Sequence, residues 1–127
     1  MENGLKSGVL SNRDRFFELL TPIFEKSKYF MIKKTMEKKY KEKKIEVLYK
    51  GTNEHFCHIW CHSRNNRLDL LLPNVKVPAI AKEYELETNC KTVLKQQKLE
   101  GMLATSFQEM DESVLLGICK YIAGNSL

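Results

Sequence analysis

Residues 45–72, IEVLYKGTNEHFCHIWCHSRNNRLDLLL, decide the fold. The stretch holds three short runs rich in apolar, aromatic and β-branched residues, and each run ends in a cluster of residues that favours a turn. Connections this short join strands that lie antiparallel. We therefore predict a three-stranded antiparallel meander, with strands at Ile45–Tyr49, Phe56–His62 and Arg67–Leu72 and turns at Lys50–Asn53, Ser63–Asn66 and Pro73–Asn74.

Two amphipathic helices are predicted before the meander. Ser11 is placed to cap the first helix, Asp14 follows three residues later, and Pro22 either ends this helix or starts the next. The second helix is Tyr29–Lys44, with a strand that begins at Tyr29–Ile32 as the alternative. The apolar stripe of the first helix is Phe16, Leu19, Leu20 and Ile23, and that of the second is Tyr29, Ile32, Met36 and Tyr40, opposite Lys34, Lys38 and Lys41.

Three further helices are predicted after the meander. The signals that place them are Pro78 in a first turn, Thr88-Asn89 as the cap of a helix that runs through Gly101 to Phe107, and Asp111 and Gly124 at the ends of a last helix. The fold is therefore predicted to be α+β, with N-terminal helices, the three-stranded antiparallel meander, and C-terminal helices packed on the sheet.

Length and composition limit the class of protein. The chain has 127 residues, of which 43% are hydrophobic and 29% charged, as expected for one globular domain. Residues 1–10 are expected to be a flexible tail before a single α+β domain of residues 11–127. No run approaches the ~20 apolar residues that span a bilayer, and no hydrophobic signal core is present, so we expect a cytoplasmic or nuclear protein. The cysteines are then expected to be reduced and mostly buried: Cys57, Cys61, Cys90 and Cys119.

The net charge of +5 is concentrated in one part of the chain. Residues 26–50 hold ten lysines against three glutamates, a local charge of +7, so the remaining residues sum to −2. A lysine-rich helix face is most often simply solvated. Repulsion among so many like charges nevertheless favours an anionic partner, and the nucleic-acid backbone is the most abundant one. An acidic protein surface or an anionic membrane would also attract these lysines.

All three histidines and two cysteines fall in residues 54–62, EHFCHIWCH, which raises the question of a zinc site. On a strand, Cys57 and Cys61 share a face but lie roughly 13 Å apart. Two thiolates on one zinc ion have sulfurs at most about 4 Å apart. The same distance separates His58 from His62. A metal would need this segment to be helical or looped, or further ligands from a distant cysteine, so we predict no metal and no cofactor.

Alternation along this strand places the two cysteines and Ile59 on one face, expected to be core, and His58, Trp60 and His62 on the other. An alternative buries Phe56 and Trp60 as well, under a helix. In the functional interpretation, the second face is a recognition surface on which aromatic rings stack bases and cations hold phosphates. Its residues would be His58, Trp60 and His62, with Arg64 and Arg67 nearby.

Three functions stand as hypotheses. The first is a small basic, non-enzymatic module that contacts nucleic-acid phosphates without reading base sequence. Its contacts would be Lys33, Lys34, Lys38, Lys41, Lys44, Arg64 and Arg67. The second is a protein-interaction adaptor whose apolar C-terminal helix, residues 113–123, joins an acidic protein partner or a second copy of the chain as a homodimer. The third is a small enzyme that uses Cys57, His58 or His62, although alternation points Cys57 and His58 to opposite faces and no nucleotide-binding or nucleophile motif occurs.

Overall fold

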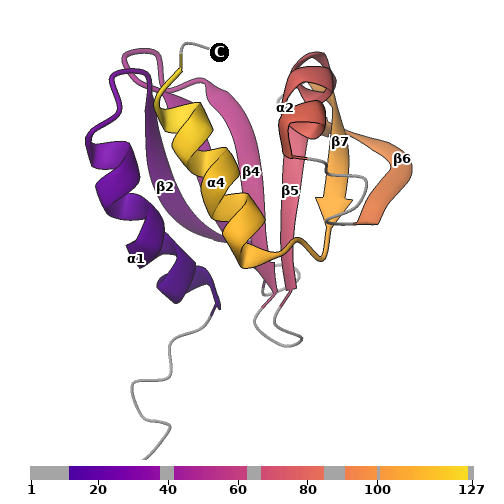
Figure 1. Cartoon of the computed structure of the whole chain (residues 1–127), viewed down its shortest axis with the longest axis horizontal. Helices are drawn as coiled ribbons and strands as arrows, with labels where there is room; N and C mark the ends of the chain where they lie inside the picture. Colours follow the sequence, from indigo (N-terminus) through magenta and orange to yellow (C-terminus); the bar gives the residue numbers. More distant parts are fainter. Residues whose placement is uncertain (1–11, 38–41, 63–66, 85–90, 100, 126–127) are drawn as a thin grey trace, which may run out of the picture.

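The computed structural model describes residues 12–37, 42–62, 67–84, 91–99 and 101–125, and Figure 1 shows how its elements are arranged. The predicted tail at residues 1–10, the cap at Ser11, the turn at Ser63–Asn66 and the cap at Thr88–Asn89 lie outside these residues. The elements in chain order are α1 (Asn12–Glu25), β2 (Phe30–Glu37), β3 (Glu42–Tyr49), β4 (His55–His62), β5 (Arg67–Pro73), the 3₁₀ turn η1 (Asn74–Lys76), α2 (Val77–Tyr84), β6 (Lys91–Leu99), β7 (Met102–Gln108) and α4 (Glu112–Ala123).

The strands form one antiparallel sheet in the order β2-β3-β4-β5-β7-β6. The predicted meander is its centre, because the three predicted strands correspond to β3, β4 and β5. The turn predicted between the first two is also present, and Gly51 there has a φ of 96°, which glycine adopts without steric cost. The α+β class is confirmed, but the sheet extends beyond three strands on both sides.

The predicted helix at Tyr29–Lys44 is wrong, because this segment forms β2 and the beginning of β3. The alternative, a strand that begins at Tyr29–Ile32, is confirmed as β2. The two strands pair with Phe30 opposite Tyr49. Phe30 is fully buried, and its ring centre lies 4.9 Å from the ring centres of both Tyr49 and Phe56. Burial of an aromatic side chain is worth roughly 2–3 kcal/mol, which exceeds the helix preference of any one residue in this segment. Tertiary packing of Phe30 therefore outweighs the helical spacing of the lysines that predicted a helix.

The predicted helix that ends at Phe107 is wrong as well. Residues 91–99 and 102–108 form the hairpin of β6 and β7, and Gly101, expected inside a helix, has a φ of 87° at the turn. Phe107 is buried and lies opposite Leu70 of β5. Without β7, the backbone groups of β5 that now bond to it would lose their partners. Pairing with β5 thus takes precedence over the apolar spacing that suggested a helix.

The helix predicted near the N-terminus is confirmed as α1. It buries Phe16, Leu20 and Phe24, which are four residues apart and so lie on one face. Leu19, expected in the same stripe, is 39% exposed. Pro22 lies inside the helix and neither ends it nor starts another.

The two helices predicted at Pro78 and Asp111 are also confirmed. Pro78 lies in the first turn of α2, where a missing N–H costs nothing. The Asp111 carboxylate caps α4 by accepting a hydrogen bond from the Ser113 backbone N–H at 3.0 Å. Gly124 follows the last residue of α4, as predicted.

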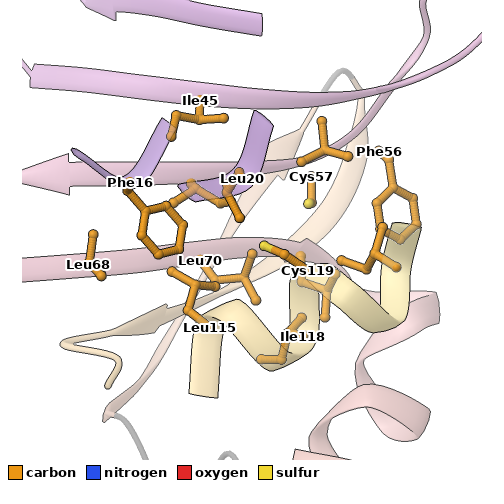
Figure 2. Close-up of a cluster of buried hydrophobic side chains, with 14 of the residues drawn as sticks. Phe16, Leu20, Ile45, Phe56, Cys57, Leu68, Leu70, Leu115, Ile118 and Cys119 are labelled. Carbon is orange, nitrogen blue, oxygen red and sulfur yellow. The ribbon is translucent and has the colours of Figure 1, made fainter. Parts of the chain in front are cut away.

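α1 and α4 pack against the same face of the sheet, and Figure 2 shows the core between these layers. Two hydrogen bonds link α4 to the N-terminal part of the chain, one from α1 itself and one from Ser27, which follows α1. The Arg15 guanidinium donates to the Glu112 carboxylate at 2.8 Å, and the Ser27 hydroxyl donates to the Ala123 carbonyl at 2.7 Å. Among the described helices, none combines the length and the apolar character that a membrane crossing requires.

Candidate functional site on the polar face of the sheet

The sheet face opposite α1 and α4 carries a row of polar side chains from β2 to β5, and we call it the polar face. Cross-strand pairing defines it, because residues opposite each other on neighbouring strands point to the same side. One row pairs Lys33 with Glu46 and Glu46 with His58, and the next pairs Lys44 with Trp60 and Trp60 with Asp69. The polar and aromatic side chains of this face include Lys33, Lys44, Glu46, His55, His58, Trp60, His62, Arg67 and Asp69, and the apolar Leu48 and Leu71 lie among them.

Trp60 of β4 lies on this face between Lys44 of β3 and Asp69 of β5. The Lys44 ammonium sits over its indole, 5.3 Å from the ring centre, which is within the range of a cation–π contact. Trp60 is partly exposed. The predicted alternative that buries Trp60 under a helix together with Phe56 therefore holds only for Phe56, which is 1% exposed and lies in the core.

His62, Arg67 and Asp69 form a hydrogen-bonded group beside Trp60. Asp69 Oδ2 accepts from Arg67 Nη2 at 3.0 Å and lies 3.0 Å from His62 Nε2. The other carboxylate oxygen, Oδ1, accepts the backbone N–H of Glu109 at 2.9 Å. Asp69 is 4% exposed, and these partners offset the cost of its burial. The group holds Arg67 and His62 in fixed positions at the end of the polar face.

A second group on the polar face joins Glu46 of β3 to His55 and His58 of β4. The Glu46 carboxylate is hydrogen-bonded to His55 Nε2, and His58 Nε2 lies 3.8 Å from the same oxygen. Alternation alone would place His55 and His58 on opposite faces, because they are three residues apart. A register shift between Val47 and Leu48, a β-bulge, brings both to the same side.

Burial and neighbouring charges set the protonation of Glu46 and His58. Burial lowers the pKa of His58 from 6.5 to about 4, because the charged imidazolium is disfavoured away from water, and the nearby Lys44 charge acts in the same direction. For Glu46, burial would raise the pKa, but the hydrogen bond with His55 and the Lys44 charge outweigh it, so the pKa is lowered. At neutral pH, His58 is therefore neutral and Glu46 is ionised.

The structure separates the lysines that the sequence placed on one helix face. Lys33 is exposed on the polar face and Lys44 is partly exposed there. Lys34 points to the opposite side, where its ammonium lies 3.4 Å from the Asp14 carboxylate and 5.0 Å from the Phe17 ring centre. Lys38, Lys41 and Arg64 lie outside the described residues.

The cysteine chemistry expected of a thiol enzyme has no support in the described residues. Cys57, Cys61 and Cys119 are free and buried, as predicted for core thiols. Burial raises the pKa of Cys57 and of Cys119, so both thiols are protonated at neutral pH and are poor nucleophiles. Cys57 also faces the core, whereas His58 belongs to the polar face. Cys90 lies outside the described residues.

The apolar surface of α4, which the adaptor hypothesis uses, is occupied by the core. Leu115, Ile118 and Ile122 are fully buried and Leu116 is partly buried. An amphipathic helix that covers its own sheet in this way leaves little apolar surface for a partner.

Three residues of the site had no predicted role: Glu46, His55 and Asp69. Glu46 and Asp69 each interrupt a run of apolar residues in a predicted strand, and such a buried acid requires a partner. That signal was available in the sequence, but the partner depends on strand register. Comparison with known proteins adds no family to this description, because no family model matches the chain and no curated protein or solved structure is significantly similar to it.

Proposed function

We propose that this chain is a non-enzymatic nucleic-acid-binding module that contacts a single strand through the polar face. The observation that carries the proposal is the partly exposed indole of Trp60, with the Lys44 ammonium 5.3 Å from its ring centre and Arg67 held two strands away from Lys44. Aromatic rings on a sheet face stack unpaired bases, and flanking cations neutralise the phosphates between them.

The distribution of charge supports an anionic ligand at this position. Residues 26–50, which include β2 and β3, hold ten of the chain's lysines against three glutamates. Lys33 and Lys44 stand on the polar face itself. The acidic residues of that face, Glu46 and Asp69, are already engaged with histidine or arginine, so they repel an incoming phosphate less than free carboxylates would.

An unpaired strand is a better ligand for this surface than a duplex. Stacking on one aromatic ring needs a base whose flat face is accessible, and in a duplex those faces are covered by neighbouring base pairs. Phosphate contacts set affinity without reading sequence, so binding is expected to tolerate changes of base. Lys38, Lys41 and Arg64 remain predicted further contacts, whereas Lys34 faces away and is not part of the proposed surface.

The test is binding of fluorescently labelled single-stranded DNA and RNA across a salt series. In Lys33→Gln/Lys44→Gln, binding should weaken, and the slope of log K against log salt should become shallower by about 1.4, because each lost phosphate contact removes about 0.7. The matched control is Lys26→Gln/Lys120→Gln, which removes the same charge from a pocket between α1 and α4 on the helix side. This control should retain most of the affinity and a steep slope.

Trp60 provides a second, local readout, because it is the chain's single tryptophan. Its fluorescence should be quenched when a base stacks on the indole. Trp60→Leu should weaken binding by about 1–3 kcal/mol with little change in the salt slope. Absence of binding even at low salt would overturn the proposal and leave an acidic protein partner as the charge-based alternative. Equal losses in the two double-lysine variants would overturn the placement on the polar face.

A further inference from the structure

The Glu46–His55–His58 group brings together one carboxylate and two imidazoles at the β-bulge. One donor atom from each residue lies within 4.8 Å of the donor atoms of the other two. The centres of the two imidazole rings are 5.3 Å apart, with the rings nearly perpendicular at 79°. Rings in this arrangement are not stacked face to face, so their nitrogens can converge on one point from different directions.

His58 provides an independent sign that this group has a ligand. Its side chain is 8% exposed, and within the described chain its Nε2 has no hydrogen-bond partner. The nearest carboxylate oxygen of Glu46 is 3.8 Å away, which is beyond hydrogen-bond distance. A buried nitrogen without a partner costs about 1–3 kcal/mol, and native structures rarely retain one unless water or an ion satisfies it. The atom points toward the carboxylate that would share that ion.

We propose that Glu46, His55 and His58 form a binding site for a divalent transition-metal ion of the Zn²⁺ class. Zn²⁺ binds imidazole nitrogen and carboxylate oxygen at about 2.0–2.2 Å, so its tetrahedral ligands lie roughly 3.3 Å apart. Donors now within 4.8 Å reach that spacing through small side-chain rotations. His55 has room for such a rotation, because its side chain is 24% exposed.

The donor set selects the class of metal. Imidazole suits Zn²⁺, Fe²⁺, Ni²⁺ and Cu²⁺, whereas Mg²⁺ and Ca²⁺ require oxygen ligands. Three protein donors leave a fourth tetrahedral position for water or another small ligand, in contrast with structural zinc sites, which use four protein ligands. The two strands and the bulge hold the donors, so the site is built into the sheet. The inference does not depend on nucleic-acid binding.

The test uses the full chain, stripped of metal with a chelator, kept under a reductant, and titrated with Zn²⁺ and with Co²⁺ as a visible probe. One ion should bind per chain, and bound Co²⁺ should show the visible absorption of tetrahedral coordination. Glu46→Gln, His55→Gln and His58→Gln should each weaken binding at least ~10-fold. The matched control is His62→Gln, on the same strand and face but hydrogen-bonded to Asp69, and it should bind as the wild type does.

Imidazole ¹⁵N spectra of the wild-type protein avoid the risk that a variant fails to fold. On addition of Zn²⁺, the ring nitrogens of His55 and His58 should shift and those of His62 should not. The proposal is overturned if Zn²⁺ at about tenfold excess leaves all three histidines unchanged. It is also overturned if His62→Gln weakens binding as much as His58→Gln does, or if bound Co²⁺ shows thiolate charge-transfer absorption from cysteine ligands. These readouts involve no nucleic acid, so their outcome is separate from that of the proposed function.

Discussion

Phe56 and Cys57 are consecutive residues of one strand, yet both side chains lie in the core between the sheet and the helices. In a regular strand, neighbours point to opposite faces. The bulge opposite Val47 and Leu48 accounts for the exception, because it gives β4 one more residue than β3 over this stretch. The same extra residue places His55 and His58 on the polar face.

The bulge predicts that Phe56 contributes strongly to stability. Phe56→Ala should lower the free energy of unfolding by about 3–5 kcal/mol, because the ring is 1% exposed and packs against Phe30 and Tyr49. Leu19→Ala, at a position that is 39% exposed, should cost no more than about 1 kcal/mol. Urea denaturation of both variants measures the difference. Similar costs would mean that Phe56 points away from the core.

Gly101 distinguishes the β6–β7 hairpin from the helix that the sequence suggested. At a φ of 87°, any side chain strains the backbone, so Gly101→Ala should destabilise the protein by about 1 kcal/mol, although no atom lies within 4 Å of the added Cβ. Inside a helix, the same change would stabilise by about 1 kcal/mol. Gly124→Ala is the control, because φ is −95° there. Thermal unfolding gives the sign, and a stabilised Gly101→Ala would contradict the hairpin.

Asp69 should be one of the most sensitive polar positions in the chain. Asp69→Ala removes a buried acceptor from Arg67 and from the Glu109 backbone N–H, so the free energy of unfolding should fall by about 3 kcal/mol. Asp69→Asn, which keeps an oxygen for the Glu109 N–H, should lose less. Glu18→Ala, at an exposed carboxylate on α1, serves as the reference in the same urea experiment. A loss no larger than that of Glu18→Ala would show that the buried group is dispensable.

Burial of neutral His58 predicts a loss of stability in mild acid. Its pKa is 6.5 when exposed and about 4 in the folded protein, so below pH 6.5 the unfolded chain binds the proton more readily. The contribution is therefore complete above about pH 6.5 and falls as the pH drops toward about 4, by roughly 2–3 kcal/mol. Urea denaturation from pH 7.5 to pH 4, with a chelator present, should show a steeper decline for wild type than for His58→Gln. Parallel curves would contradict this account of His58.

How much of the fold could be predicted depended on whether the signal was local. The three central strands, the cap at Asp111 and the helix containing Phe16 were correct because turn residues, caps and helical spacing lie within a few residues of each other. β2 and β6–β7 were assigned to helices because what fixes them is distant. Phe30 lies in a strand because it packs on Phe56. Residues 102–108 form a strand because they pair with β5.

The candidate site was predicted in part for the same reason. Alternation correctly grouped His58, Trp60 and His62, and the distance argument against Cys57 with Cys61 rests on the same extended strand that the structure contains. Glu46 and Asp69 could be identified only as acids among apolar neighbours. Their histidine partners follow from register, and in the case of His55 from a bulge that single-sequence patterns do not reveal.

The placement of α1 against α4 has a consequence for how the chain folds. Phe16 and Leu20 share one core with Leu115 and Ile118, about one hundred residues later in the chain. Pairings of such long sequence separation slow folding, because the chain loses much of its loop entropy before the contacts form. During synthesis, the part of the core between α1 and α4 therefore stays open until α4 has been made. The apolar side chains of α1 that α4 covers in the folded protein are open to aggregation or chaperone binding at this stage.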